Sequence, residues 1–404
     1  MKYGFNLSKF RSVGYMLFFL TILDNRYMAY APVLFLVYSL RIIYALKGYY
    51  LVYKNLVETG RTSYPKLFIL QLLFSFAIVT SGIINNNITY GIVYSIFIWL
   101  GITSYILNTG ITNSTFLRTI DGMLKLIVVI TLLLTVLAPE VMVTYSYDGS
   151  RVVEGFFGGK NALPPYLLMA LCLNLLVYEI DRKKKMWRMY LYPLICTILL
   201  AFSGSGTGLV IAVIFLILFY TNLYKLLNLY NVIIIHTVLF FSIVVYRLQE
   251  RFLYPLIVNV LHRDITLTYR TDIWFIAIRY FTNGWFLGYG LGNDAVAKNL
   301  LLPNWFTQVI NETHNGILDI TLSLGIMGLI PFLQFIICML KEYDKSGNTC
   351  ISQVMKLYVF VYFIIAISES VFTLSRLTFW SMLFIGLVIT QKGVEVKKAA
   401  NANN

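Results

Sequence analysis

The chain carries LPPYLLMALCLNLLVYEIDRKKKMWR at residues 163–188, and this stretch decides the class of fold. Residues 163–179 are apolar, and a helix needs about 17–25 such residues to cross a membrane. The basic run at 182–188 follows within a few residues. Lysine and arginine gather in the cytoplasmic loops of membrane proteins, so the run predicts that this helix ends in the cytoplasm. Beyond that orientation, we expect the run to be a solvated loop.

The whole chain has the composition of a membrane protein. Its 404 residues are 59% hydrophobic and 12% charged, whereas a soluble domain is about half apolar and about a quarter charged. The formal net charge of +14 first suggests nucleic acid as a partner. Most lysines, however, fall in alternate loops, as the positive-inside rule requires. We therefore expect contact with membrane lipid and none with nucleic acid.

Twelve apolar segments are predicted to span the membrane, with eleven to thirteen allowed. They are 11–23, 27–46, 67–84, 89–108, 122–138, 163–179, 189–203, 207–221, 230–246, 316–340, 357–370 and 371–390. The predicted fold is an all-α polytopic bundle that forms one membrane domain over 1–404. Both termini are expected in the cytoplasm, and the protein in the cytoplasmic (inner) membrane.

The basic residues left on the outer side are mostly arginines. These are Arg26, Arg151, Arg247, Arg251, Arg263, Arg270, Arg279 and Arg376. Guanidinium groups hold phosphate oxygens in a bidentate fork, whereas lysine acts as a point charge. The bias favours an anionic phosphate ligand at the outer face. Salt bridges with external acidic residues are the alternative.

One external segment, 247–315, is long and has apolar residues at helical spacing. In YRTDIWFIAIRYF, Trp274, Ala277, Ile278 and Phe281 form one face, and Arg279 lies on the other. Such helices are predicted to lie at the membrane interface rather than to span it. The glycines of FLGYGLGND, including Gly290, would allow the backbone to approach a ligand closely, or would simply form a turn.

Three ionisable residues at the outer ends of predicted spans are functional candidates. His314 lies just before the span at 316–340 and is followed by Asn315, but a single histidine can also be structural. Glu369, in AISESVF, is a candidate base, or a partner of Arg376 seven residues later. Asp319 can orient His314 or pair with an arginine.

Several of these residues occur in a familiar order. RTDIW at 270–274, GWFLGYGLGN at 284–293 and THNGILDITLSLGIMGLI at 313–330 resemble the C-terminal signature of the O-antigen ligase and Wzy-type polysaccharide polymerase superfamily. The earlier GFFGGKNALPPYL is similar to a Gly-x-Phe-x-x-x-Asn segment of the family. The similarity covers about 150–390, and the predicted topology agrees with it.

One departure limits the comparison. Family members often carry Ser-Arg-Ser-Gly in a central turn, where this chain has SGSG at 203–206. The role of an arginine there cannot be transferred. Arg151 or Lys160 is a candidate replacement.

The resemblance implies a GT-C-like fold and a metal-independent, inverting glycosyl transfer without a cofactor. Donor and acceptor would be glycans on undecaprenyl pyrophosphate at the extracytoplasmic face, for capsule, exopolysaccharide or O-antigen. The implied catalytic residues are Arg270 on the pyrophosphate, His314 as base or phosphate ligand, and Glu369 as a further base. The implied substrate-binding residues are Arg279, Lys160, Arg151, Asn315, Trp274 and Gly290.

Three functions remain open at this stage. A polymerase would join lipid-linked repeat units, with a chain-length regulator as a candidate partner. A ligase would transfer the finished glycan to another acceptor. A lipid-glycan flippase, which is a transporter rather than an enzyme of glycan synthesis, is the third candidate. Transporters often show internal sequence repeats and charged residues at the membrane midplane, and neither is evident in the sequence.

Overall fold

The computed structural model describes the chain in segments. These are residues 7–23, 30–109, 114–145, 151–157, 161–181, 186–252, 254–260, 265–267, 270–291, 313–345 and 350–402. The fold is helical throughout these segments except for one short hairpin, so the predicted all-α class is confirmed. The hairpin pairs β1 (Val143–Tyr145) with β2 (Arg151–Val153) in antiparallel register. β-branched residues dominate it, and Val152 and Val153 are buried.

Each predicted span coincides with a helix. The long helices are α2 (Ala31–Thr59), α3 (Pro65–Ile84), α4 (Tyr90–Thr109), α5 (Ser114–Leu137), α7 (Leu163–Ile180), α16 (Gly316–Lys345) and α17 (Cys350–Ser368). The others are α1 (Leu7–Ile22), α9 (Leu191–Phe202), α10 (Gly206–Tyr220), α11 (Leu229–Leu239) continued by η4 (Phe240–Val245), and α18 (Leu377–Ala402). In the described part of the chain, seven helices are long and apolar enough to cross a membrane. The count of twelve therefore stays a prediction.

Several predicted boundaries differ from the observed helix ends: α5 begins at Ser114 rather than 122 and α17 at Cys350 rather than 357, and two further differences have a clear physical reason. The span expected at 27–46 is the first part of a longer helix that runs to Thr59 and ends where Gly60 adopts a left-handed conformation, with φ of 66°. Glycine meets no steric penalty in that conformation, so it is a common helix terminator. The last span was expected from 371, but α18 begins at Leu377 because residues 369–376 form an extended turn.

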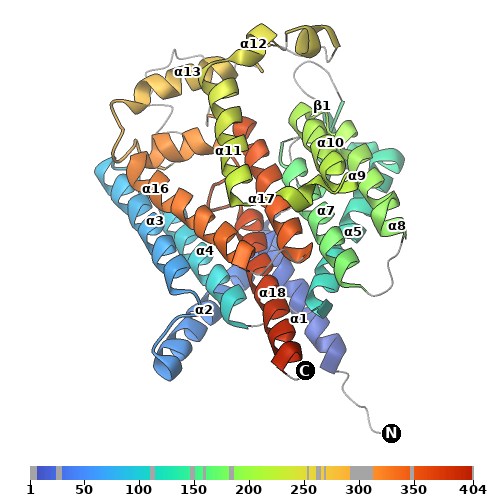
Figure 1. Cartoon of the computed structure of the whole chain (residues 1–404), viewed down its shortest axis with the longest axis vertical. Helices are drawn as coiled ribbons and strands as arrows, with labels where there is room; N and C mark the ends of the chain where they lie inside the picture. The colour runs from blue at the N-terminus through green and yellow to red at the C-terminus, as the bar shows by residue number, and fades with distance from the viewer. Residues whose placement is uncertain are drawn as a thin grey trace.

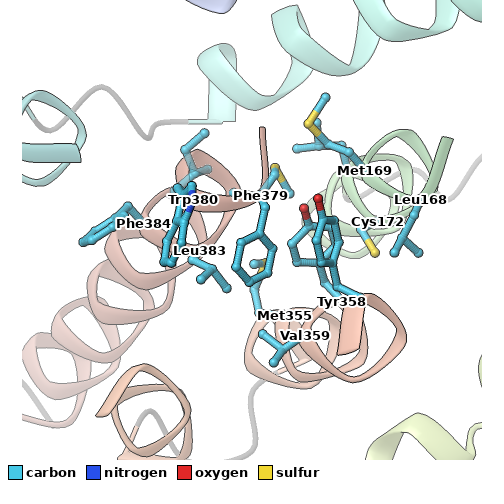
Figure 2. Close-up of a cluster of buried hydrophobic side chains, with 14 of the residues drawn as sticks. Leu168, Met169, Cys172, Met355, Tyr358, Val359, Phe379, Trp380, Leu383 and Phe384 are labelled. Atoms are coloured by element: carbon cyan, nitrogen blue, oxygen red, sulfur yellow. The ribbon is translucent and has the colours of Figure 1, made fainter. Parts of the chain in front are cut away.

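The core of the bundle lies around α7 and α17. In the most apolar windows of these helices 89% and 83% of residues are buried, against 22% in α2. Figure 2 shows the packing of α7, α17 and α18 side chains, including Leu168, Met169, Cys172, Met355, Tyr358, Val359, Phe379, Trp380, Leu383 and Phe384. The peripheral helices instead expose large apolar side chains such as Phe35 and Val136. Lipid is the solvent that such a surface requires.

The two ends of the bundle differ in content (Figure 1). The start of α1 and the end of α18 lie at one end, and α12 (Leu248–Phe252), α13 (Arg270–Phe281) and β1 lie at the other. This separation agrees with the predicted grouping of the loops. The side of the membrane that each end faces stays a prediction.

Helix α16 is broken at Gly325, where φ is 58° and ψ is −159°. The segment 285–290 lies across the break. Ile326 N–H donates to the Trp285 carbonyl at 2.8 Å, and Tyr289 N–H donates to the Leu322 carbonyl at 2.8 Å. Backbone groups inside a bilayer must find partners within the protein, and this segment supplies them. It also ties the chain that follows α13 to α16.

The basic run after α7 is not simply solvated. Arg188 in α8 (Met186–Met189) is half-buried and its Nη1 lies 3.0 Å from a carboxylate oxygen of Asp121 in α5. Lys125 approaches the same oxygen at 2.5 Å, and Arg188 also lies 3.8 Å from Asp181. The expectation of a solvated loop is therefore wrong for Arg188, since Asp121, 67 residues earlier, and the nearby Asp181 neutralise its charge. Residues 182–185 lie outside the described segments.

Candidate functional site

Arg270 and Glu369 form an ion pair at the end of the bundle that carries α13. Arg270 is the first residue of α13, and Glu369 directly follows α17. Arg270 Nη2 lies 2.8 Å from Glu369 Oε1, and the two side chains are only 14% and 7% exposed. The carboxylate expected to act as a base or to pair with Arg376 is thus a direct partner of Arg270. A guanidinium fork has further N–H donors, so this contact does not exhaust Arg270.

Helix α13 is held by its apolar face, as the spacing predicted. Trp274 and Ala277 are fully buried and pack in one cluster with Leu318 of α16 and Ile367 of α17. The indole N–H of Trp274 donates to the carbonyl oxygen of Thr313 at 3.0 Å. Trp274 therefore anchors α13 beside the residue that precedes His314, and its one polar group already has a protein partner.

His314 sits in a turn that two side chains hold. Its φ is 51°, a left-handed conformation that is strained for a residue with a side chain. On one side of it, Asp319 Oδ1 accepts hydrogen bonds from the backbone N–H and the hydroxyl of Thr313, at 2.9 and 2.6 Å. On the other side, Asn315 Oδ1 caps α16 by accepting from Leu318 N–H at 2.9 Å. Asp319 and Asn315 thus hold the turn at His314 in place, directly ahead of α16 in the sequence.

Asn315 is fully buried, and both ends of its amide are used. Its Nδ2 donates to the Ile367 carbonyl at 2.8 Å, which ties the start of α16 to α17. Both amide atoms of Asn315 therefore already have protein partners, and a substrate-binding role for this side chain stays a prediction. Asp319, expected to orient His314 or to pair with an arginine, acts on the turn through Thr313. The positive charge of Arg376 also acts on its carboxylate.

The pKa of His314 is lowered to about 4 by burial and then by the positive charge of Arg270. Its imidazole is therefore neutral near pH 7. A neutral imidazole can accept a proton, whereas an imidazolium would be needed to bind a phosphate by charge. The geometry thus brings Arg270, Glu369 and His314 together and favours the first of the two roles expected for the histidine.

The other outer arginines differ in their surroundings. Arg247 donates to the Thr271 carbonyl and lies 3.4 Å from Asp272, so it secures the start of α13, as the salt-bridge alternative predicted. Arg279 is exposed on the outer face of α13. Arg151 lies in β2 and pairs with Tyr145 of β1. Lys160, Arg26 and Arg263 lie outside the described segments.

The glycine cluster contacts protein rather than open space. Gly290 has φ of 90°, and a Cβ there would lie 1.9 Å from the Asn87 amide. A Cβ on Gly288 would lie 2.3 Å from the backbone carbon of Ser323 in α16. Both glycines are needed for the segment to enter the break in α16. Contact of Gly290 with substrate stays a prediction.

Two features of the site were missed by the sequence analysis. The ion pair joins residues 99 positions apart, and nothing local marks them as partners. The Thr313–Asp319 contact had a weak signal, since a threonine and an aspartate flank an asparagine that caps a helix. Among the described residues, no group of three His, Cys, Asp or Glu side chains could hold a metal ion.

Comparison with known proteins identifies one segment of the chain. A family model described as O-antigen ligase matches residues 167–333. The match begins in α7 and includes Arg270, Trp274, His314 and the break in α16. The resemblance to the O-antigen ligase and Wzy-type polysaccharide polymerase superfamily is thereby confirmed. No curated protein matches the chain.

Proposed function

We propose that this chain, which matches the O-antigen ligase family over residues 167–333, is a membrane-bound polysaccharide polymerase. It joins oligosaccharide repeat units that are linked to undecaprenyl pyrophosphate, at the outer face of the cytoplasmic membrane. The product is a capsule, exopolysaccharide or O-antigen chain. The transfer inverts the anomeric carbon and uses no metal ion.

The observation that carries the proposal is the buried Arg270 beside a neutral His314. A lipid pyrophosphate is the leaving group of the reaction, and negative charge grows on it as the bond to the sugar breaks. Preorganised cationic donors stabilise such charge most strongly where water is excluded. Arg270, 14% exposed and fixed by Glu369, meets that requirement. Arg279, Arg151 and Lys160 are the additional candidates for the diphosphate.

The reaction follows from these positions. The acceptor hydroxyl oxygen attacks the anomeric carbon of the donor from the face opposite the pyrophosphate. The bond from that carbon to the phosphate oxygen breaks, and its electron pair leaves with the lipid pyrophosphate. The hydroxyl proton passes to a base. His314, neutral at pH 7, is the first candidate for that base.

Glu369 is the second candidate base. In the structure its carboxylate is paired with Arg270. A diphosphate bound to Arg270 competes with that carboxylate and frees it to accept a proton. The two candidates differ in the pH at which activity is lost and in the effect of replacing each residue separately.

A ligase is the second candidate function because the matched family is described by that activity. It differs from the polymerase only in the acceptor, which would be a different molecule from a lipid-linked repeat unit. The donor, the diphosphate leaving group and the roles of Arg270 and His314 would be the same.

Reconstitution separates these functions. The purified chain is placed in proteoliposomes with lipid-linked repeat units, and the products are resolved on a gel. A ladder of increasing length supports the polymerase. A single transfer to an added second acceptor identifies a ligase, and movement of intact lipid-linked glycan across the bilayer without transfer identifies a flippase.

A further inference from the structure

Arg247 connects the end of the α11–η4 helix to the first turn of α13. It follows η4 after one residue, and its φ is 51°, a left-handed conformation that is strained for a residue with a side chain. Figure 1 shows that α11 reaches the end of the bundle that carries α12 and α13. The chain therefore turns at Arg247 where this helix meets α13, and strain of this kind persists only where neighbouring contacts hold it.

The guanidinium group of Arg247 contacts the start of α13 in three places. Its Nη2 donates to the backbone carbonyl oxygen of Thr271 and lies 3.4 Å from Asp272 Oδ1. Its central carbon lies 5.4 Å from the centroid of the Phe275 ring, within the range of a cation–π contact. Thr271 is fully buried and directly follows Arg270. Arg247 therefore holds the backbone of α13 directly beside Arg270.

The charge of Arg247 is balanced by carboxylates of its own. Asp272 approaches Nη2, and Glu250 Oε1 of α12 lies 3.8 Å from Nη1. The side chains of Arg247, Glu250 and Asp272 are 28%, 31% and 47% exposed, whereas Arg270 and Glu369 are 14% and 7% exposed. The two arginines thus form separate ion pairs, one near the surface and one in the interior. Contacts with protein on two sides favour a role in holding α13.

The position of Arg270 depends on how the first turn of α13 is held. Arg270 is the first residue of the helix, so a shift of the helix start moves its guanidinium group. Trp274 anchors α13 one turn later, and Val244 of η4 packs in the same buried cluster. Arg247 therefore extends from a helix that is itself packed against α13. A misplacement of about 1 Å in an active site can lower the rate about 100-fold.

We propose that Arg247 is a positioning residue for Arg270, which fixes the first turn of α13 so that the Arg270 guanidinium meets the diphosphate of the lipid-linked donor. The inference rests on the proposed function and adds a residue that acts through Arg270. The competing role is that of a second diphosphate ligand, as first expected for the outer arginines. A residue that acts through Arg270 has no effect once Arg270 is removed, whereas an independent ligand keeps its effect.

A double-mutant cycle with Arg270→Ala measures this difference. Arg247→Met removes the guanidinium group and keeps an unbranched apolar stem beside Phe275. The carboxylates of Asp272 and Glu250 are partly exposed to water, so we expect the variant to fold. The purified full-length chain is assayed in proteoliposomes for transfer from lipid-linked repeat units. Binding of undecaprenyl pyrophosphate without sugar is measured separately, and the melting temperature of each variant is recorded.

The effect of Arg247→Met should depend on Arg270. With Arg270 present, we expect kcat to fall at least about tenfold and the affinity for undecaprenyl pyrophosphate to fall at least about fivefold. In the Arg270→Ala chain, the same substitution should change each quantity by no more than about twofold. Asp272→Asn weakens the same contact from α13 and should lower kcat about threefold, again only with Arg270 present, so the cycle stays measurable if Arg247→Met does not fold.

Two further variants complete the test. Arg247→Lys should keep kcat within about threefold of wild type, because an ammonium group can still donate to the Thr271 carbonyl and pair with Asp272. Arg251→Ala is the matched control, since Arg251 is an exposed arginine on α12, and we expect wild-type kcat and affinity.

Equal losses of kcat and affinity in the two backgrounds would overturn the proposal. With an unchanged melting temperature, that result identifies Arg247 as an independent diphosphate ligand, and with a lowered one it identifies a general effect on stability. Wild-type kcat and affinity in Arg247→Met and in Asp272→Asn would overturn it as well. If the wild-type chain transfers no glycan, the proposed function itself fails, while the binding measurements still test whether Arg247 acts through Arg270.

Discussion

Arg270→Ala removes the guanidinium group on which the proposed chemistry depends. In the structure its Nη2 lies 2.8 Å from Glu369 Oε1, and neither side chain is more than 14% exposed. The substitution therefore has two effects that must be separated. It removes a cation from the leaving group, and it leaves a carboxylate buried without its partner.

Each effect has an expected size. Loss of one preorganised donor to a developing charge typically lowers kcat by about 10²–10³, which corresponds to about 2.7–4 kcal/mol. Removal of one partner from a buried ion pair costs about 3–5 kcal/mol of stability. We expect the lower part of that second range, because Arg270 keeps some exposure at the edge of the bundle.

A double variant separates catalysis from stability. Arg270→Ala combined with Glu369→Gln removes the stranded charge, so the melting temperature should return most of the way to wild type. Activity in the proteoliposome assay should stay at least 100-fold below wild type. Single lipid-linked repeat units should accumulate instead of polymer. Arg270→Lys should also be poor, because it keeps the charge but loses the fork.

Two results would refute this reasoning. One is an Arg270→Ala chain that remains folded and makes polymer at a rate close to wild type. The other is a double variant that regains activity together with stability, since that would make the ion pair purely structural.

Three further predictions concern the histidine, the broken helix and the metal requirement. His314→Gln should lower kcat/KM by about 10²–10⁴, and full activity in this variant would make His314 structural. The wild-type kcat/KM should be level from about pH 6 to about pH 8, because a base with its pKa lowered to about 4 loses its function only as the pH falls through that value. Gly325→Ala should lower the melting temperature, since φ at Gly325 is 58° and an added Cβ would lie 2.3 Å from the Phe286 backbone. Gly14→Ala is the control and should not lower it, because nothing lies within 4 Å of its added Cβ. Equal melting temperatures for the two variants would contradict the packing described at the break in α16. EDTA should leave the transfer rate of the purified chain unchanged, and a strict requirement for a divalent cation would contradict the proposed stabilisation by arginine.

The helical bundle could be predicted because hydrophobic periodicity and charge segregation are local signals. The apolar stretch at 163–179 and the basic residues after it specify a span and its direction without any knowledge of distant contacts. The same holds for the apolar face of α13, where Trp274 and Ala277 are buried as the spacing predicted. Boundaries were less predictable where a terminator such as Gly60 lies beyond the apolar window.

The chemistry of the site was less predictable because its contacts are long-range. Arg270 and His314 were found by residue type and by resemblance, but the partner of Arg270 was not, because Glu369 lies 99 residues away. The glycines of the 284–293 segment were expected either to approach a ligand or to form a turn, and Gly290 lies against Asn87. A glycine pattern indicates that another group lies close to the backbone, but it does not identify that group as a ligand or as another part of the protein.

The proposed chemistry requires that α13 presents Arg270 on the extracytoplasmic side. Thr282→Cys places a thiol on an exposed residue directly after α13, and Thr59→Cys places one at the exposed end of α2, the side expected in the cytoplasm. Intact cells are treated with a membrane-impermeant maleimide, with the wild-type chain as the blank for native cysteines. We predict labelling of Thr282→Cys in intact cells and of Thr59→Cys only after permeabilisation. Labelling of Thr282→Cys only after permeabilisation would contradict the account.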